Sequence, residues 1–170
     1  MFFACTESQG DLQRLGTELG IRVSEAVDAG ALTIELLGHL DESLDEMGHK
    51  LLRMVDEQKV RRLVVDGLAG LGDTLAFPER GNRFLGRLLR ELKKRGVTSM
   101  FTVDPHALAA ATGTPFAHGV IGWFDNAMAL ASDLDGSRSL TIKKVRGSRA
   151  GKTSVDVHLQ SPHSGGREGR

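Results

Sequence analysis

The stretch Arg61-Arg62-Leu63-Val64-Val65-Asp66-Gly67 is the most informative part of the sequence, because an aliphatic run ends there in a carboxylate and a glycine. A short continuous apolar run predicts a strand that is buried within a parallel sheet. In open α/β sheets, the crevice beyond the carboxyl ends of the strands is where ligands bind. Asp66 is therefore the first candidate site residue.

Strand-like apolar runs alternate with helical patterns along most of the chain, which predicts an α/β fold with a largely parallel sheet. The expected strands cover residues 1–6, 30–37, 63–65, 98–103 and 123–130. The expected helices cover residues 11–19, 44–57 and about 84–92, with one or two helical turns at 107–111. Alternating residues at 139–143 and 154–159 predict a C-terminal antiparallel hairpin with its turn over 147–153.

Length and composition favour one domain of a cytoplasmic protein. The chain has 170 residues, of which 40% are hydrophobic, and its formal net charge is zero. The single cysteine excludes an intrachain disulfide and fits a reducing compartment. No stretch approaches the ~20 apolar residues that a membrane span requires, and no secretion signal precedes the first strand. We expect the domain to cover residues 1–160 and residues 161–170 to form a disordered tail.

Asp66 leaves two interpretations open. A carboxylate held at a strand end suits Mg²⁺, which keeps several waters and takes one or two carboxylates together with phosphate oxygens. An Asp-Gly pair is also a common turn, so Asp66 could instead cap the next turn.

Glu7 follows a second apolar strand, Phe3-Ala4-Cys5-Thr6. If this strand neighbours the one that ends at Asp66, both carboxylates share one edge of the sheet, and Glu7 could orient or deprotonate a water. The alternative is that Glu7 caps the following helix.

Lys144 and Arg146 lie on one face of the strand expected near the C-terminus, because side chains alternate along a strand. Two cations that project together can neutralise phosphate charge, including that of a neighbouring subunit. The alternative is a solvated edge strand that is protected by lysines.

Other chemistries find little support. Residues 147–153 resemble a phosphate loop, but three residues separate the glycines where four are needed, and a strand is expected after them. The six histidines form no zinc-type pair, and no Gly-x-Ser-x-Gly elbow occurs. Residues 80–95 are basic and residues 41–57 are acidic, so the two segments could attract each other, pair subunits or contact nucleic acid. Nucleic acid is the weaker option, because no aromatic side chains interleave for base stacking.

In their order along the chain, these segments resemble the KaiC branch of the RecA-like ATPases, from Phe2 to about Leu159. The segments that carry the resemblance are Phe3 to Ser8, Leu44 to Leu52, Arg61 to Leu68, Gly96 to Thr102, and Asp125-Asn126 with Lys144 to Ser148. The resemblance implies a RecA-like three-layer α/β sandwich with a mostly parallel sheet and a C-terminal antiparallel hairpin. It also implies ATP and Mg²⁺ as cofactors and a role in signalling or regulation. The lack of a long apolar stretch leads us to expect no membrane partner.

The resemblance also implies roles for four residues. Asp66 would organise Mg²⁺, through water, at the end of a Walker B strand, and Glu7 would be the catalytic glutamate. Lys144 and Arg146 would reach the nucleotide of an adjacent subunit, which implies a homo-oligomer, a hexamer-like ring, or a related ATPase subunit as partner.

Three departures from the family pattern shape what we expect. Thr6 replaces the first of two adjacent glutamates, and Ser148, Arg149 and Ala150 stand where a histidine commonly follows the Lys-x-Arg-Gly motif. The family's first strand and its Walker A phosphate loop precede the segment that begins at Phe2, so we expect an N-terminally incomplete fold and weak or absent ATP hydrolysis. Two alternatives stay open: a non-enzymatic subunit that lends Lys144 and Arg146 to a partner ATPase, and a recombinase-like DNA-binding protein.

Overall fold

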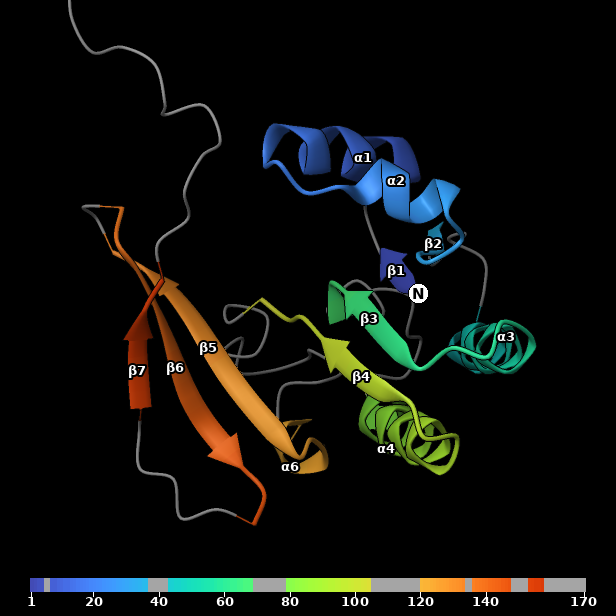
Figure 1. The fold of residues 1–170 in the computed structure, drawn as a ribbon. Helices are drawn as coiled ribbons and strands as arrows, with labels where there is room; N and C mark the ends of the chain where they lie inside the picture. The colour runs from blue at the N-terminus through green and yellow to red at the C-terminus, as the bar shows by residue number, and fades with distance from the viewer. Residues whose placement is uncertain are drawn as a thin grey trace, which may run out of the picture. The chain divides into compact units, whose positions relative to one another are not determined.

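A computed structural model describes residues 1–4, 7–36, 43–68, 79–104, 120–133, 136–147 and 153–157. The chain divides into two compact units, residues 1–120 and 121–170, and each is described by itself (Figure 1). The expected tail at 161–170 and the expected helical turns at 107–111 lie outside the described residues. No helix within the described ranges is long and apolar enough to cross a membrane.

The first unit contains a four-stranded sheet in the order β2-β1-β3-β4, and every neighbouring pair in it is parallel. The strands are β1 (Phe2–Ala4), β2 (Ile34–Leu36), β3 (Arg62–Asp66) and β4 (Thr98–Phe101). The register places Ala4 of β1 opposite Asp66 of β3, and Val65 of β3 opposite Phe101 of β4. The predicted parallel sheet is therefore confirmed, and β1 and β3 end at the same edge.

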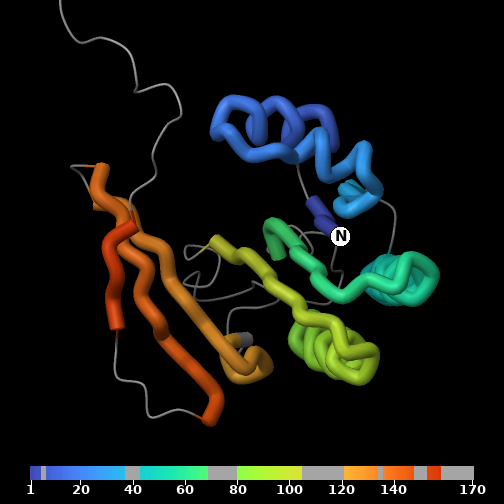
Figure 2. Tube along the Cα trace, in the orientation of Figure 1, coloured from blue at the N-terminus to red at the C-terminus, as the bar shows by residue number. Residues whose placement is uncertain are grey.

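Helices cover both faces of this sheet, which gives three layers. The helices are α1 (Gln9–Glu18), α2 (Val23–Asp28), α3 (Leu44–Glu57) and α4 (Glu79–Lys94). Figure 1 shows α1 and α2 on one face and α3 beside α4 on the other, and the Cα trace in Figure 2 follows the same course. Three of these helices were predicted. The helix α2 was not, because it has only six residues and no buried side chain to form an apolar stripe.

The core lies between the sheet and its helices. Phe3, Leu63 and Val65 point to one face of the sheet by register and are fully buried. The helices contribute apolar stripes at helical spacing, namely Met47, Leu51 and Val55 of α3 and Leu85, Leu88 and Leu92 of α4. Burial of such side chains stabilises the fold by about 1.5–3 kcal/mol each, so the strand that carries Asp66 is firmly held.

Local polar contacts decide where α3 begins. The Ser43 hydroxyl accepts a hydrogen bond from the Glu46 amide, and the Glu46 carboxylate accepts one from the Ser43 amide. This capping box satisfies amides at the helix start that would otherwise lack partners. Hydrogen bonds donated by the Ser43 amide and by the Ser43 hydroxyl to the Glu46 carboxylate lower the pKa of Glu46.

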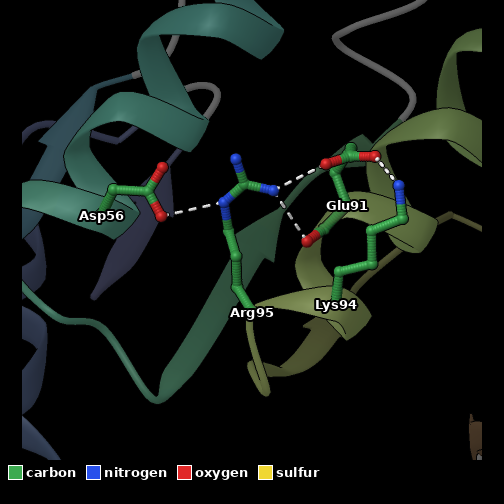
Figure 3. Close-up of polar contacts among 4 residues, drawn as sticks. All are labelled: Asp56, Glu91, Lys94 and Arg95. Atoms are coloured by element: carbon green, nitrogen blue, oxygen red, sulfur yellow. Dashed lines mark hydrogen bonds and ion pairs between the residues drawn. The ribbon is translucent and has the colours of Figure 1, made fainter.

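Arg95 joins the ends of α3 and α4 (Figure 3). Its Nε donates to Asp56 at 2.9 Å, and its Nη1 donates to the Glu91 carboxylate at 2.8 Å and to the Glu91 carbonyl at 3.0 Å. The ion pair between Asp56 and Arg95 is one contact of the kind expected from the attraction between the acidic segment 41–57 and the basic segment 80–95. Hydrogen bonds from Lys94 and Arg95 lower the pKa of Glu91.

The second unit is an antiparallel sheet in the order β5-β6-β7, preceded by the short helix α6 (Val120–Trp123). Its strands are β5 (Asn126–Ser132), β6 (Arg138–Val145) and β7 (Thr153–Asp156). The predicted hairpin is confirmed. The strand expected at 123–130 begins only at Asn126, because residues 120–123 form a helical turn. Since β6 precedes and β7 follows the loop-like stretch at 147–153, the strand-to-helix context of a phosphate loop is absent.

Candidate functional site

Asp66 lies half-buried at the carboxyl end of β3, where the end of β4 holds its side chain. The Thr102 hydroxyl donates a hydrogen bond to Asp66 Oδ1. The same hydroxyl accepts a hydrogen bond from the Gly67 amide at 2.8 Å. The described contact of this carboxylate therefore goes to the neighbouring strand, which favours a fixed site residue over an aspartate that only caps its own turn.

Backbone hydrogen bonds also join Thr102 to the residues on either side of Asp66. The Thr102 amide donates to the Val65 carbonyl at 3.0 Å, and the Leu68 amide donates to the Thr102 carbonyl at 2.9 Å. Gly67 has φ of 84°, a left-handed conformation that glycine adopts without strain. The chain can thus turn away directly after Asp66 while Thr102 bridges both sides of the turn.

Glu7 lies at the same edge of the sheet as Asp66. The two strands are parallel neighbours, and Glu7 comes three residues after Ala4, which the register sets opposite Asp66. The side chain of Glu7 is exposed. The alternative in which Glu7 caps α1 is wrong, because Ser8 is the cap: its hydroxyl accepts from the Asp11 amide at 3.2 Å.

Lys144 and Arg146 belong to the second unit, and the corner between α6 and β5 holds both of them. Lys144 Nζ donates to the carbonyls of Ile121 at 3.1 Å and Gly122 at 3.2 Å. Arg146 pairs with the Asp125 carboxylate at 2.9 Å. The strand β6 lies in the middle of its sheet, but its described pairing with β7 covers only Ser139 to Ile142, so the interpretation of these cations as guards of a solvated edge stays open.

The described residues suit a Mg²⁺ ion that arrives with phosphates better than an ion held by protein alone. They contain no cluster of three His, Cys, Asp or Glu side chains that could hold a metal. Asp66 supplies a single carboxylate, and Mg²⁺ is commonly bound by one or two carboxylates plus substrate phosphates and waters. The residues therefore fit Mg²⁺ as a nucleotide complex.

Thr102 is the site residue that sequence reasoning missed. The expected strand at 98–103 includes it, but nothing in its neighbourhood along the chain points to Asp66, which is 36 positions away. One signal existed: Thr102 is a polar residue at the carboxyl end of the strand that follows the Asp66 strand in order.

Comparisons with known proteins identify the family and the fold of this chain. The family model described as "ATPase: KaiC" matches residues 2–161. Among solved structures, the chain is similar to a KaiC-like protein from the hyperthermophilic archaeon Pyrococcus horikoshii OT3, with a TM-score of 0.71 and 18% sequence identity. That match covers 94% of this chain and 72% of the archaeal one, and it shows the RecA-like α/β fold. A search of the curated proteins found no match.

Proposed function

This chain belongs to the KaiC family of ATPases, and from that premise we propose that Asp66 organises Mg²⁺ beside the phosphates of ATP. The observation that carries the proposal is the fixed Asp66 carboxylate at the end of β3, held by the Thr102 hydroxyl. Mg²⁺ bound with the nucleotide would neutralise the charge that develops on the transferred phosphoryl group. Asp66 would orient that ion through bound water.

Glu7 has the second role in the proposal. It is an exposed carboxylate at the edge where Asp66 lies, and a carboxylate in that position can accept a proton from a water that attacks the γ-phosphate. The Ser8 cap fixes the start of α1 directly after it. Glu7 follows β1 in the chain and directly precedes the Ser8 cap of α1, which supports this role.

We propose that hydrolysis by the 170 residues alone is feeble. Phosphoryl transfer depends on positioning and charge stabilisation, and a phosphate loop supplies much of both. The chain as given contains no Gly-x-x-x-x-Gly-Lys-Thr sequence.

Lys144 and Arg146 would serve the nucleotide of an adjacent subunit in a ring, typically a hexamer. Such reach requires Lys144 to leave the carbonyls of Ile121 and Gly122, and Arg146 to leave Asp125. Exchange of one anionic partner for another keeps the arginine paired, which makes this step chemically reasonable. A regulatory role in the cytoplasm belongs to the same proposal.

Nucleotide binding tests the role of Asp66. We expect the purified chain to bind a fluorescent ATP analogue weakly and in a Mg²⁺-dependent manner, and Asp66→Asn to remove the Mg²⁺ dependence. The matched control is Asp28→Asn, an exposed carboxylate on α2, which should bind like the parent. Equal Mg²⁺ dependence in the parent and in Asp66→Asn would contradict the proposal, and so would robust ATP turnover that survives Asp66→Ala.

A further inference from the structure

We propose that Thr102 is a positioning residue, whose hydroxyl commits one Asp66 oxygen and leaves the other to face the hydrated Mg²⁺. The inference rests on the proposed function of Asp66. Asp66 Oδ1 accepts from the Thr102 hydroxyl, and Oδ2 has no hydrogen bond or ion pair within the described part of the chain.

The direction of the Thr102 hydroxyl proton follows from its two partners. A backbone amide can only donate, so the Gly67 amide takes a lone pair of the hydroxyl oxygen. An ionised carboxylate can only accept, so the single hydroxyl proton points to Asp66 Oδ1. The Thr102 hydroxyl is therefore oriented by the Gly67 amide, and it in turn orients the Asp66 carboxylate.

The hydroxyl has little freedom to move elsewhere. Thr102 is held by its amide to Val65 and by its carbonyl to Leu68. As a β-branched residue it also has restricted rotation about χ1. Its anchor points flank Asp66 on both sides in sequence, so the side chain and the carboxylate share one rigid frame.

This arrangement suits a demanding ion. Mg²⁺ requires near-ideal octahedral geometry, and the partners of its ligands orient them. A carboxylate with one oxygen committed presents the other oxygen in a defined direction. Without the hydroxyl, Asp66 could rotate, and the Gly67 amide would lose its hydrogen-bond acceptor.

Two substitutions separate positioning from packing. Thr102→Val keeps the shape of the side chain and removes both hydrogen bonds, whereas Thr102→Ser keeps the hydroxyl and removes a methyl group. The probe is the Mn²⁺ complex of ATP, and its binding to the chain is measured by the enhancement of water proton relaxation. Loss of ligand-orienting partners typically weakens metal affinity by roughly 10- to 100-fold. We expect Thr102→Val to show a loss in that range and Thr102→Ser to stay near the parent.

The control variant Asp66→Asn separates the proposed role of Thr102 from the proposed role of Asp66. If Asp66→Asn abolishes Mn²⁺ binding while Thr102→Val binds like the parent, the positioning role is refuted and the role of Asp66 stands. If Asp66→Asn also binds like the parent, the proposed function itself fails. Urea unfolding of each variant checks the fold, and equal losses of affinity in Thr102→Val and Thr102→Ser would likewise overturn the role of the hydroxyl.

Discussion

At the scale of single residues, the proposed Mg²⁺ site depends on a carboxylate that has little room to move. The Asp66 carboxylate shares the Thr102 hydroxyl with the backbone of its own turn, whereas Lys144 and Arg146 would have to leave their partners to reach a nucleotide. Chemistry that needs a fixed carboxylate is served by such contacts, because no reorganisation is required when the ligand arrives.

Gly16 illustrates the same tightness in the first helix. A Cβ added at Gly16 would lie 2.9 Å from Val23 Cβ, and it would also clash with the Val23 Cγ2 atom. Overpacking costs about 1–3 kcal/mol, which exceeds the gain of about 0.8–1.0 kcal/mol from replacing glycine by alanine in a helix. We therefore expect Gly16→Ala to lower the free energy of unfolding by roughly 1 kcal/mol, as measured by urea denaturation.

Gly10 is the matched control in the same helix. Its nearest neighbour to an added Cβ is the Ser8 hydroxyl, at an ordinary contact distance of 3.8 Å. Gly10→Ala should therefore be neutral or stabilising by up to about 1 kcal/mol. If both alanine variants prove equally stabilising, then α1 does not pack on Val23 as described.

At the scale of elements, Arg95 is the link between α3 and α4. Arg95→Met keeps the apolar stem and removes the contacts with Asp56 and Glu91, so we expect a lower urea midpoint at pH 7. Lys94→Met is the control, because Lys94 pairs with Glu91 within the same stretch of chain and its described ion pair does not join two helices. It should change the midpoint less.

The difference in urea midpoint between the parent and Arg95→Met should depend on pH through the ionisation of Glu91. The pKa of Glu91 is lowered in the folded state. The contribution of Glu91 to the free energy of unfolding is therefore fully present above the ordinary pKa of a glutamate, and it is lost as the pH falls through the lowered pKa. The ordinary glutamate value is about 4.3. The difference in urea midpoint between the parent and Arg95→Met should therefore become smaller below roughly pH 4. A difference that stays constant between pH 7 and pH 3 would exclude this origin.

At the scale of the whole molecule, the parallel sheet could be predicted because its strands are continuous apolar runs separated by helices with clear stripes. The apolar stripe of α3 predicts a helix over 44–57, and the structure has the helix over the same residues. Features without a local signature were missed. The six-residue helix α2 has no buried face, and Trp123 continues an apolar stretch although it lies in a helical turn.

The site residues, like the helices and strands, could be predicted only where the sequence carries a local pattern. Asp66 could be predicted because a carboxylate after an apolar strand is visible in sequence. The hydroxyl that holds it could not, because the contact joins two strands that are adjacent only after folding. The partners of Lys144 were also hidden, since backbone carbonyls leave no mark in a sequence.

Paramagnetic mapping by NMR can show whether Asp66 lies at a Mg²⁺–nucleotide site, because it detects even weak binding and locates it on the chain. Mn²⁺ with ATP would be added in substoichiometric amounts to the ¹⁵N-labelled chain, and the loss of amide signal intensity recorded along the sequence. We expect the strongest losses at Gly67, Leu68 and Thr102, whose amides surround Asp66, and we expect these losses to disappear in Asp66→Asn. Losses centred elsewhere, or losses at these amides that persist in Asp66→Asn, would contradict the proposed role of Asp66.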